Sequence, residues 1–276
     1  MKKTILAACA MFAFIGGAFA QQGGPNLRSH AALILDAQHG RILFDKNADT
    51  VMPIASITKL MTAIVVLDAQ LPLGERITVE SADIDVIKNT RSRLRVGASL
   101  TRRELLRLAL MSSENRAAAA LGRTYPGGIN AFVEAMNNKA FELGMGNSYF
   151  VDSTGLNSTN VSTARDLAKM VDAAYAYNII REFSTTATHA VAFGDEDRSL
   201  HFSNSNNLVR SGSWDIGISK TGFLSEAGRC LVMQAKISGK PVIIVLLDSW
   251  GKNSRIGDAN RIKKWMEIGF ARKVRG

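Results

Sequence analysis

The sequence predicts an α+β protein, with an antiparallel sheet built from both chain ends, flanked by helices and carrying an inserted all-helical subdomain. Short β-rich segments occur near the N-terminal end, at about residues 31–49, and return after about residue 188. Between them, from Thr101 to about residue 177, apolar residues recur at helical spacing. Strands at both ends around a helical middle are typical of a sheet assembled from both termini.

Residues 1–20, MKKTILAACAMFAFIGGAFA, have the features of a cleaved secretory signal peptide. Two lysines precede an apolar run that starts at Ile5, and small residues stand at Ala18 and Ala20. We expect cleavage after Ala20 and a periplasmic mature chain. No later stretch reaches the ~20 apolar residues of a membrane span. We therefore expect no transmembrane span in the mature chain, and peripheral membrane contact stays open.

The segment Leu6–Cys9 matches the short box that precedes a lipidated cysteine. Cleavage there would leave only Thr4–Ala8 as the apolar region, which is too short for a signal. Loss of residues 1–20 removes Cys9, so Cys230 remains alone and no intramolecular disulfide can form. Its apolar neighbours predict a buried, inert thiol.

The composition is that of a globular chain, with 276 residues, 46% hydrophobic and 21% charged. We expect residues 21–276 to form a single catalytic domain in two lobes, with the helical lobe at about residues 80–185. The formal charge of +10 falls to +8 when Lys2 and Lys3 leave with the signal. This charge suits binding to an anionic surface or a carboxylate-rich polymer, although positive charge spread over the surface also simply keeps a protein soluble. Nucleic acid does not fit the compartment.

The individual elements follow in order. Residues 31–49, AALILDAQHGRILFDKNAD, predict a hairpin. Residues 54–67, after Pro53, are apolar on every side and predict a central buried helix. Thr101 and Glu104 form a capping box that opens a series of helices, of which the last starts near Thr163. After the late strands, residues 258–270 predict a terminal amphipathic helix that covers the sheet.

Ser56 and Lys59 are three residues apart at the start of the buried helix, so both side chains lie on one face. A serine hydroxyl needs a base within hydrogen-bond reach before it attacks a carbonyl, and a neutral lysine can serve. Neutral lysine at physiological pH requires a bias of ~4 kcal/mol against the charged form. An apolar surround and a second nearby cation would both contribute to it.

The spacing alone is weak evidence, because Ser249-Trp-Gly-Lys252 repeats it. That copy follows a strand, contains Gly251 and opens no helix, so its two side chains need not share a face.

Two further motifs matter more. Ser113-Glu-Asn115 lies at the break between two helical patterns, where its polar pair either projects from a loop or caps a helix.

Lys220-Thr-Gly222 ends a late strand. An exposed strand there could pair with a substrate peptide, with Lys220 presented to a carboxylate and Gly222 allowing close backbone approach. The alternative is a plain strand end. No metal or other cofactor is expected, because His30, His39, His189 and His201 show no paired ligand spacing.

The three motifs in this order, together with their flanks, resemble the serine D,D-peptidases, the low-molecular-mass penicillin-binding proteins. Further matching stretches are PIASITKLMTAIVVLD, FVDSTGLN, STARDLAKM and SNSNNLV, so the resemblance spans roughly residues 28–270. The variant ALMSSENRAAAA most resembles the D-alanyl-D-alanine endopeptidase subgroup. The resemblance implies a β-lactamase/transpeptidase-like fold. Because the chain ends 56 residues after Lys220, we expect neither the second β-rich domain nor the C-terminal amphipathic anchor of the carboxypeptidases.

The resemblance also implies roles for the motif residues. Ser56 would be the acyl-ester nucleophile and Lys59 its general base. Ser113 would relay a proton to the leaving amine, and Asn115 would hold Lys59 and the substrate. Lys220 would lower the pKa of Lys59 and bind the carboxylate beyond the scissile bond.

Thr221 would assist Lys220 at that carboxylate. Gly222 belongs to the same substrate-binding strand, and the backbone amides of Ser56 and Phe223 would form the oxyanion hole. The implied partners are peptidoglycan stem peptides and β-lactams, whereas the sequence says nothing of protein partners.

Three alternatives remain. A D-alanyl-D-alanine carboxypeptidase differs only in preferring a terminal D-alanine to a cross-link. A class A β-lactamase needs a glutamate for deacylation, and Glu134, the nearest candidate, stands inside a helical pattern soon after Ser113. A non-catalytic peptidoglycan-binding module would have no need for all of the motif side chains.

Overall fold

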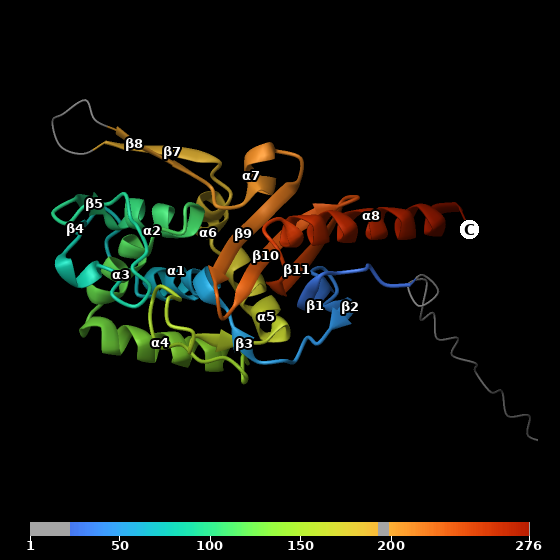
Figure 1. Ribbon diagram of the computed structural model, residues 1–276, viewed down its shortest axis with the longest axis horizontal. Coiled ribbons are helices and arrows are strands. Elements are labelled where there is room, and N and C mark those ends of the chain that lie inside the picture. Colours follow the sequence, from blue (N-terminus) through green and yellow to red (C-terminus); the bar gives the residue numbers. More distant parts are fainter. Residues whose placement is uncertain (1–22, 193–198, 276) are drawn as a thin grey trace, which may run out of the picture.

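The computed structural model describes residues 23–192 and 199–275, so the expected signal peptide lies outside the described residues. A five-stranded antiparallel sheet has the strand order β2-β1-β11-β10-β9 (Figure 1). Its strands are β1 (Ser29–Asp36), β2 (Arg41–Lys46), β9 (Asp215–Leu224), β10 (Gly228–Ile237) and β11 (Lys240–Ser249). Because β1 pairs with β11, the expectation that both chain ends build the sheet is confirmed.

The strands β1, β10 and β11 are buried on both faces, which explains their long apolar runs, whereas the edge strand β2 is largely exposed. On one face Ile34, Met233 and Ile244 pack against α8 (Ser254–Arg275), which lies across the sheet in Figure 1. The side chains of Ile262, Trp265 and Met266 complete this layer, as the sequence predicts. On the other face α5 (Ala164–Tyr175) and the helical part of the molecule share a second core with the sheet.

The central helix α1 (Thr58–Asp68) is buried on all sides, because every residue from Thr58 to Val66 is excluded from solvent. A 3₁₀ turn, η1 (Ala55–Ile57), precedes it. Around α1 lie α2 (Arg102–Met111), α3 (Asn115–Arg123), α4 (Gly128–Glu142) and α6 (Asn178–Ser184). The predicted cap is present, since the Thr101 hydroxyl accepts a hydrogen bond from the Glu104 amide at 3.1 Å.

Two expectations need adjustment. The helix α5 falls within the stretch expected to form the helical lobe, but it packs against the sheet. The strands β7 (Thr188–Ala192) and β8 (Ser199–Ser203) form a separate hairpin that projects beside α6 and does not join the main sheet (Figure 1). The remaining elements are β3 (Met52–Pro53), β4 (Arg76–Thr78), η2 (Ser81–Asp83), β5 (Ser99–Thr101), β6 (Val161–Ser162) and α7 (Asn207–Ser211).

Within residues 23–192 and 199–275, no helix has the length and apolar character needed to cross a membrane. Cys230 is fully buried in β10, and burial raises the pKa of its thiol to about 11. The predicted burial of this thiol is therefore confirmed, and the raised pKa favours low reactivity.

A buried carboxylate joins the start of the sheet to the terminal helix. Asp258 of α8 accepts hydrogen bonds from the backbone amides of Arg28, at 3.0 Å, and Ser29, at 2.8 Å, and from the Ser29 hydroxyl at 2.5 Å. Burial alone would raise its pKa, but the hydrogen bonds from Ser29, Arg28 and Arg261 together hold the pKa below its usual value. Asp258 therefore stabilises the fold in its ionised form.

We predict that Asp258→Asn lowers the free energy of unfolding by about 1–3 kcal/mol at pH 7. Because the folded pKa of Asp258 is depressed, its contribution is complete above about pH 4 and disappears as the pH falls through the folded value. Urea unfolding of both chains at pH 7 and pH 3 measures this. The exposed α5 residue Asp172 provides the control, and Asp172→Asn should change stability by less than about 0.5 kcal/mol. Equal losses for the two variants would contradict the prediction.

Candidate active site

Three segments that are distant in sequence meet at one end of the edge strand β9. They are η1 with the first turn of α1, the junction between α2 and α3, and the Lys220–Phe223 end of β9. Each of the three sequence motifs supplies one of these segments. Hydrogen bonds connect the first two directly, through Lys59 and Asn115, and the last two through Lys220 and Ser113.

Ser56 lies in the turn η1, whose shape depends on an unusual backbone conformation. Ala55 has a φ of +48°, which is rare for a residue with a side chain. Two glycines allow other segments to pack against this turn. A Cβ at Gly155 would lie 2.0 Å from the Ala55 carbonyl oxygen, and one at Gly222 would lie 2.9 Å from the Ile54 oxygen. Gly222 thus allows contact with the turn that carries Ser56, in addition to the expected approach of substrate.

Lys59 is fully buried directly behind Ser56. Its Nζ lies 2.8 Å from the Ser56 Oγ, and it donates hydrogen bonds to the Asn115 Oδ1 at 2.7 Å and the Thr154 carbonyl oxygen at 2.6 Å. Burial lowers the pKa of Lys59 to about 7, although the carboxylates of Asp152, Glu114 and Asp85 act in the opposite direction. A large fraction of Lys59 is therefore neutral at physiological pH.

The three contacts of Lys59 match the needs of a neutral amine. A neutral amine has two hydrogens and one lone pair. The oxygens of Asn115 and Thr154 accept the two hydrogens, which leaves the lone pair for the hydroxyl hydrogen of Ser56. This arrangement suits proton transfer from Ser56 to Lys59.

The α2–α3 junction places Ser113 and Asn115 in the site and leaves the capping of α3 to a third residue. Ser113 has a φ of +62°, and its Oγ accepts a hydrogen bond from Lys220 at 2.8 Å. The cap of α3 is Glu114, whose carboxylate accepts from the Arg116 amide at 3.2 Å. The motif therefore projects its polar side chains from a loop, and Ser113 and Asn115 do not cap α3.

Lys220 is buried at the edge of the sheet, where it also donates to the Thr221 carbonyl oxygen at 2.9 Å. Burial lowers its pKa well below the usual value, and the positive charges of Lys59 and Arg255 lower it further. Burial is the cause of the low pKa of Lys59, whereas the charge of Lys59 helps to lower the pKa of Lys220. The expected lowering of the Lys59 pKa by Lys220 therefore stays a prediction.

Several groups at the site were not assigned from sequence. The Thr154 carbonyl and the Ser205 hydroxyl, which accepts from Thr221 at 2.7 Å, lie in the quoted flanks FVDSTGLN and SNSNNLV, but no role followed from them. Arg255 of α8 donates to the Gly222 carbonyl oxygen at 2.8 Å and so supports the end of β9. A backbone acceptor has no signature in side-chain spacing, which explains why Thr154 was missed.

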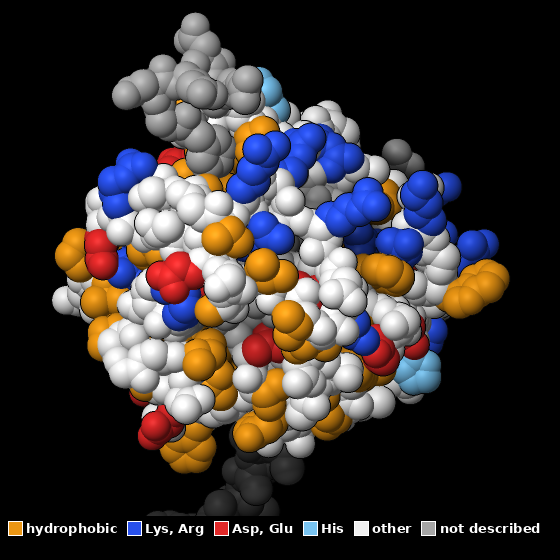
Figure 2. Space-filling model, turned by 60° about the vertical axis from the view of Figure 1, so that its left-hand side comes forward, with side chains coloured by type: hydrophobic (Ala, Val, Ile, Leu, Met, Phe, Trp, Pro, Cys, Tyr) orange, Lys and Arg blue, Asp and Glu red, His pale blue; other side chains and the backbone are white. Residues whose placement is uncertain are grey.

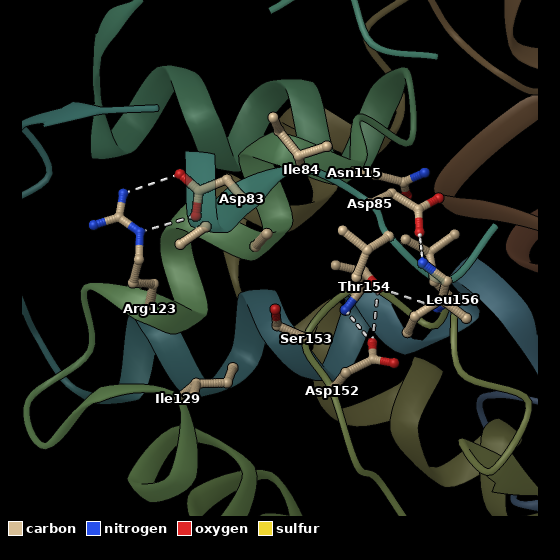
Figure 3. A pocket seen from close by; sticks show the side chains of 14 residues that line it. Asp83, Ile84, Asp85, Asn115, Arg123, Ile129, Asp152, Ser153, Thr154 and Leu156 are labelled. Carbon is tan, nitrogen blue, oxygen red and sulfur yellow. Dashed lines mark hydrogen bonds and ion pairs between the residues drawn. The ribbon is translucent and has the colours of Figure 1, made fainter. Parts of the chain in front are cut away.

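The loop that carries Thr154 is shaped by Asp152. Its carboxylate accepts hydrogen bonds from the amides of Thr154 and Gly155, each at 2.6 Å, and from the Asn157 amide at 2.9 Å. Figure 3 shows this carboxylate beside Thr154, at one wall of a pocket of about 260 Å³. Asn115 lines the same pocket, together with apolar and polar side chains, so the pocket adjoins the candidate site.

The second Ser-x-x-Lys sequence has no comparable geometry. The Ser249 Oγ lies 2.6 Å from the Ser29 Oγ at the C-terminal end of β11, whereas Lys252 is exposed in the following loop. The Phe223 ring is 56% exposed and lies 4.4 Å from the guanidinium carbon of Arg229. Among the described residues, no group of three or more His, Cys, Asp or Glu side chains could hold a metal ion.

Comparisons with known proteins agree with this site. A family model described as D-alanyl-D-alanine carboxypeptidase matches residues 18–251. The chain is 49% identical to a D-alanyl-D-alanine endopeptidase of Pseudomonas aeruginosa, over 88% of this chain and 78% of that protein. It is 46% identical to a D-alanyl-D-alanine endopeptidase of Escherichia coli, over 89% of this chain and 79% of the relative.

Solved structures show the same fold. The Streptomyces K15 DD-transpeptidase superposes with a TM-score of 0.82 at 32% identity, over 90% of this chain and 98% of that one. The penicillin-binding protein D2 of Listeria monocytogenes, in an ampicillin-bound form, gives 0.74 at 31% identity, over 90% and 100% of the two chains. The expected transpeptidase-like fold is confirmed, and the chain belongs to the D-alanyl-D-alanine carboxypeptidase family of serine peptidases.

Proposed function

We propose that the chain is a periplasmic D-alanyl-D-alanine endopeptidase, which hydrolyses peptide cross-links of peptidoglycan through an acyl-enzyme on Ser56. The observation that carries the proposal is the Lys59 amine, buried and 2.8 Å from the Ser56 hydroxyl, with its two hydrogens accepted elsewhere. The endopeptidase names of the relatives from P. aeruginosa and E. coli favour the cross-link as substrate. Such activity would act on the cell wall and so on cell shape.

In the first step Lys59 accepts the proton of Ser56, and the Ser56 Oγ attacks the carbonyl carbon of a D-alanine residue. The negative charge that develops on the carbonyl oxygen is stabilised by the backbone amides of Ser56 and Phe223. Gly222 brings β9 against the Ser56 turn, so these two amides come from adjacent segments.

In the second step the tetrahedral intermediate collapses and the amine of the neighbouring stem peptide leaves. The proton that Lys59 took from Ser56 passes to this amine through the Ser113 hydroxyl, which its hydrogen bond from Lys220 makes a better donor. Water then attacks the acyl ester, and the neutral Lys59 accepts a proton from it. Lys59 returns this proton to the Ser56 Oγ as the ester bond breaks, which releases a stem that ends in D-alanine and regenerates Ser56.

Substrate binding uses the free side of β9. This strand is at the edge of the sheet, so an extended stem peptide can pair with it. Lys220 and Thr221 meet the carboxylate beyond the scissile bond, and the basic surface suits a carboxylate-rich polymer. Figure 2 shows Lys and Arg side chains gathered along the upper right of one face of the molecule. A β-lactam, which mimics the acyl donor, would occupy the same groove.

The alternatives find less support. Glu134, the nearest match in sequence to the glutamate of a class A β-lactamase, is exposed on α4 and takes no part in the hydrogen bonds around Lys59. A non-catalytic binding module would not require a buried lysine with a pKa of about 7 next to a serine. A carboxypeptidase would use the same mechanism and differs from an endopeptidase only in its substrate, a terminal D-alanine in place of a cross-link.

We predict that the purified chain without residues 1–20 cleaves cross-linked dimeric muropeptides to monomers. The acyl-enzyme on Ser56 can form whether the leaving amine is that of a neighbouring stem peptide or that of a terminal D-alanine. Liquid chromatography of the digests measures the products. Ser56→Ala should abolish cleavage and covalent labelling by fluorescent penicillin, whereas Ser249→Ala, at the second Ser-x-x-Lys sequence, should retain both.

If only the terminal D-alanine of a pentapeptide is lost and cross-links stay intact, the chain is a carboxypeptidase and the proposed preference for cross-links is wrong. Rapid hydrolysis of nitrocefin would indicate a β-lactamase. Labelling of Ser56→Ala equal to that of the parent chain would contradict the acyl-enzyme itself.

We predict that the rate constant for acylation by penicillin rises with pH and levels off above a midpoint near the Lys59 pKa of about 7. Below the midpoint the ammonium has no lone pair for the proton of Ser56. Lys59→Arg stays protonated and should lose at least about 100-fold in acylation rate at every pH. The exposed Lys252 provides the matched control, since Lys252→Arg should leave the profile unchanged. A profile that is flat from pH 5 to 9 would contradict the role of Lys59.

A further inference from the structure

Asp85 shapes the chain segment that borders the site on the side of Asn115. Asp85 is buried, and one of its oxygens accepts hydrogen bonds from the amides of Ile87 and Lys88, each at 2.9 Å. The other accepts from the Thr90 amide at 2.9 Å and from the Thr90 hydroxyl at 2.6 Å. Figure 3 shows Asp85 next to Asn115. The segment from Asp85 to Thr90 is thus folded around one carboxylate.

Asp85 is connected to Lys59 through two further side chains. The Asn115 Nδ2 donates to the Thr90 Oγ1 at 2.8 Å, and the Asn115 Oδ1 accepts from Lys59 at 2.7 Å. Asp85, Thr90, Asn115 and Lys59 therefore form a continuous chain of hydrogen bonds that ends at the base which would activate Ser56.

The direction of each hydrogen bond in this chain follows from that of the one before it. Burial alone would raise the pKa of Asp85, but the hydrogen bonds from Thr90, Lys88 and Ile87 together hold it below the usual value, so the carboxylate only accepts. The single hydroxyl hydrogen of Thr90 is used on Asp85. Towards Asn115 the Thr90 oxygen can therefore only accept, and Asn115 must present its NH₂ group to Thr90 and its oxygen to Lys59.

We propose that Thr90 is a positioning residue, held by Asp85, which fixes the orientation of the Asn115 amide so that its oxygen faces Lys59. This proposal deepens the proposed function and rests on it. In the opposite orientation the amide NH₂ would point at Lys59 and take up its lone pair. Lys59 would then be unable to accept the proton of Ser56.

The charges around Lys59 decide how a test must be built. Carboxylates of Asp85, Glu114 and Asp152 act on Lys59, and Lys220 faces the site from β9. Thr90→Val alters none of these charges and keeps the shape of the side chain, but removes the hydroxyl. Thr90→Ser keeps the hydroxyl and removes only a methyl group. Because Thr90 is exposed, both variants should fold, which thermal unfolding checks.

The experiment measures the rate constant of acylation by fluorescent penicillin from pH 5 to 9 for the full mature chain and its variants. For Thr90→Val we expect a plateau at least about 10-fold lower, since part of the general-base contribution is lost. Its midpoint should move to lower pH, because the Lys59 ammonium loses an acceptor. Thr90→Ser should stay within about 3-fold of the parent plateau, at the same midpoint.

Asp85→Asn supplies a second variant, which also removes a carboxylate that raises the pKa of Lys59, so its plateau and not its midpoint is compared with the parent. An asparagine at this position can donate to the Thr90 oxygen, which frees the Thr90 hydroxyl to donate to Asn115 and so permits the wrong amide orientation. We expect a lower plateau here too. Because both changes act through one hydrogen-bond chain, the double variant should be no slower than the slower single variant.

Two results would overturn the proposal. In one, Thr90→Val keeps the parent plateau and midpoint. In the other, Thr90→Ser is as slow as Thr90→Val, which would show that the shape of the segment matters and the hydroxyl does not. The parent chain and Ser56→Ala, labelled in parallel, test the proposed function separately, since the site of labelling does not depend on the direction of the Asn115 amide.

Discussion

The site depends on a lysine amine that is removed from water. Burial is what brings the pKa of Lys59 to about 7, and a buried amine is stable only where its hydrogens have acceptors. Those acceptors come from the α2–α3 junction and from the loop that carries Thr154. The helices around α1 thus exclude water from the Lys59 Nζ, and the segments beside them supply the acceptors for its hydrogens.

The same constraint explains the most unusual backbone geometry of the site. Ser56 must reach Lys59 from the turn before α1, and this turn holds Ala55 at a positive φ. The strain is tolerated because neighbouring segments pack against the turn, and they can do so only where Gly155 and Gly222 lack a side chain. The glycine of the Lys-Thr-Gly motif therefore supports the turn that carries Ser56 as well as the end of β9.

The two buried lysines lie in the same site, and the charge of Lys59 lowers the pKa of Lys220. Lys220 has Ser113 and a backbone oxygen as acceptors, and its pKa is lowered by burial and by the charge of Lys59. A carboxylate bound there would offset the repulsion and favour the charged form of Lys220. Binding of a carboxylate beside Lys220 would in this way raise the pKa of Lys220 through the attraction between the two charges.

The sequence by itself determined the segments and the residue types. Hydrophobic periodicity, the capping box at Thr101 and the order of the three motifs are local features, so they predicted α1, α2, the terminal helix and the side chains of Ser56, Lys59, Ser113, Asn115 and Lys220. Only the tertiary structure decided which groups meet. The Thr154 carbonyl, the Ser205 and Thr90 hydroxyls and the Gly222 contact with the Ser56 turn depend on segments brought together by packing. The packing of α5 on the sheet and the separate β7–β8 hairpin have the same origin, because an apolar face in the sequence does not specify its partner.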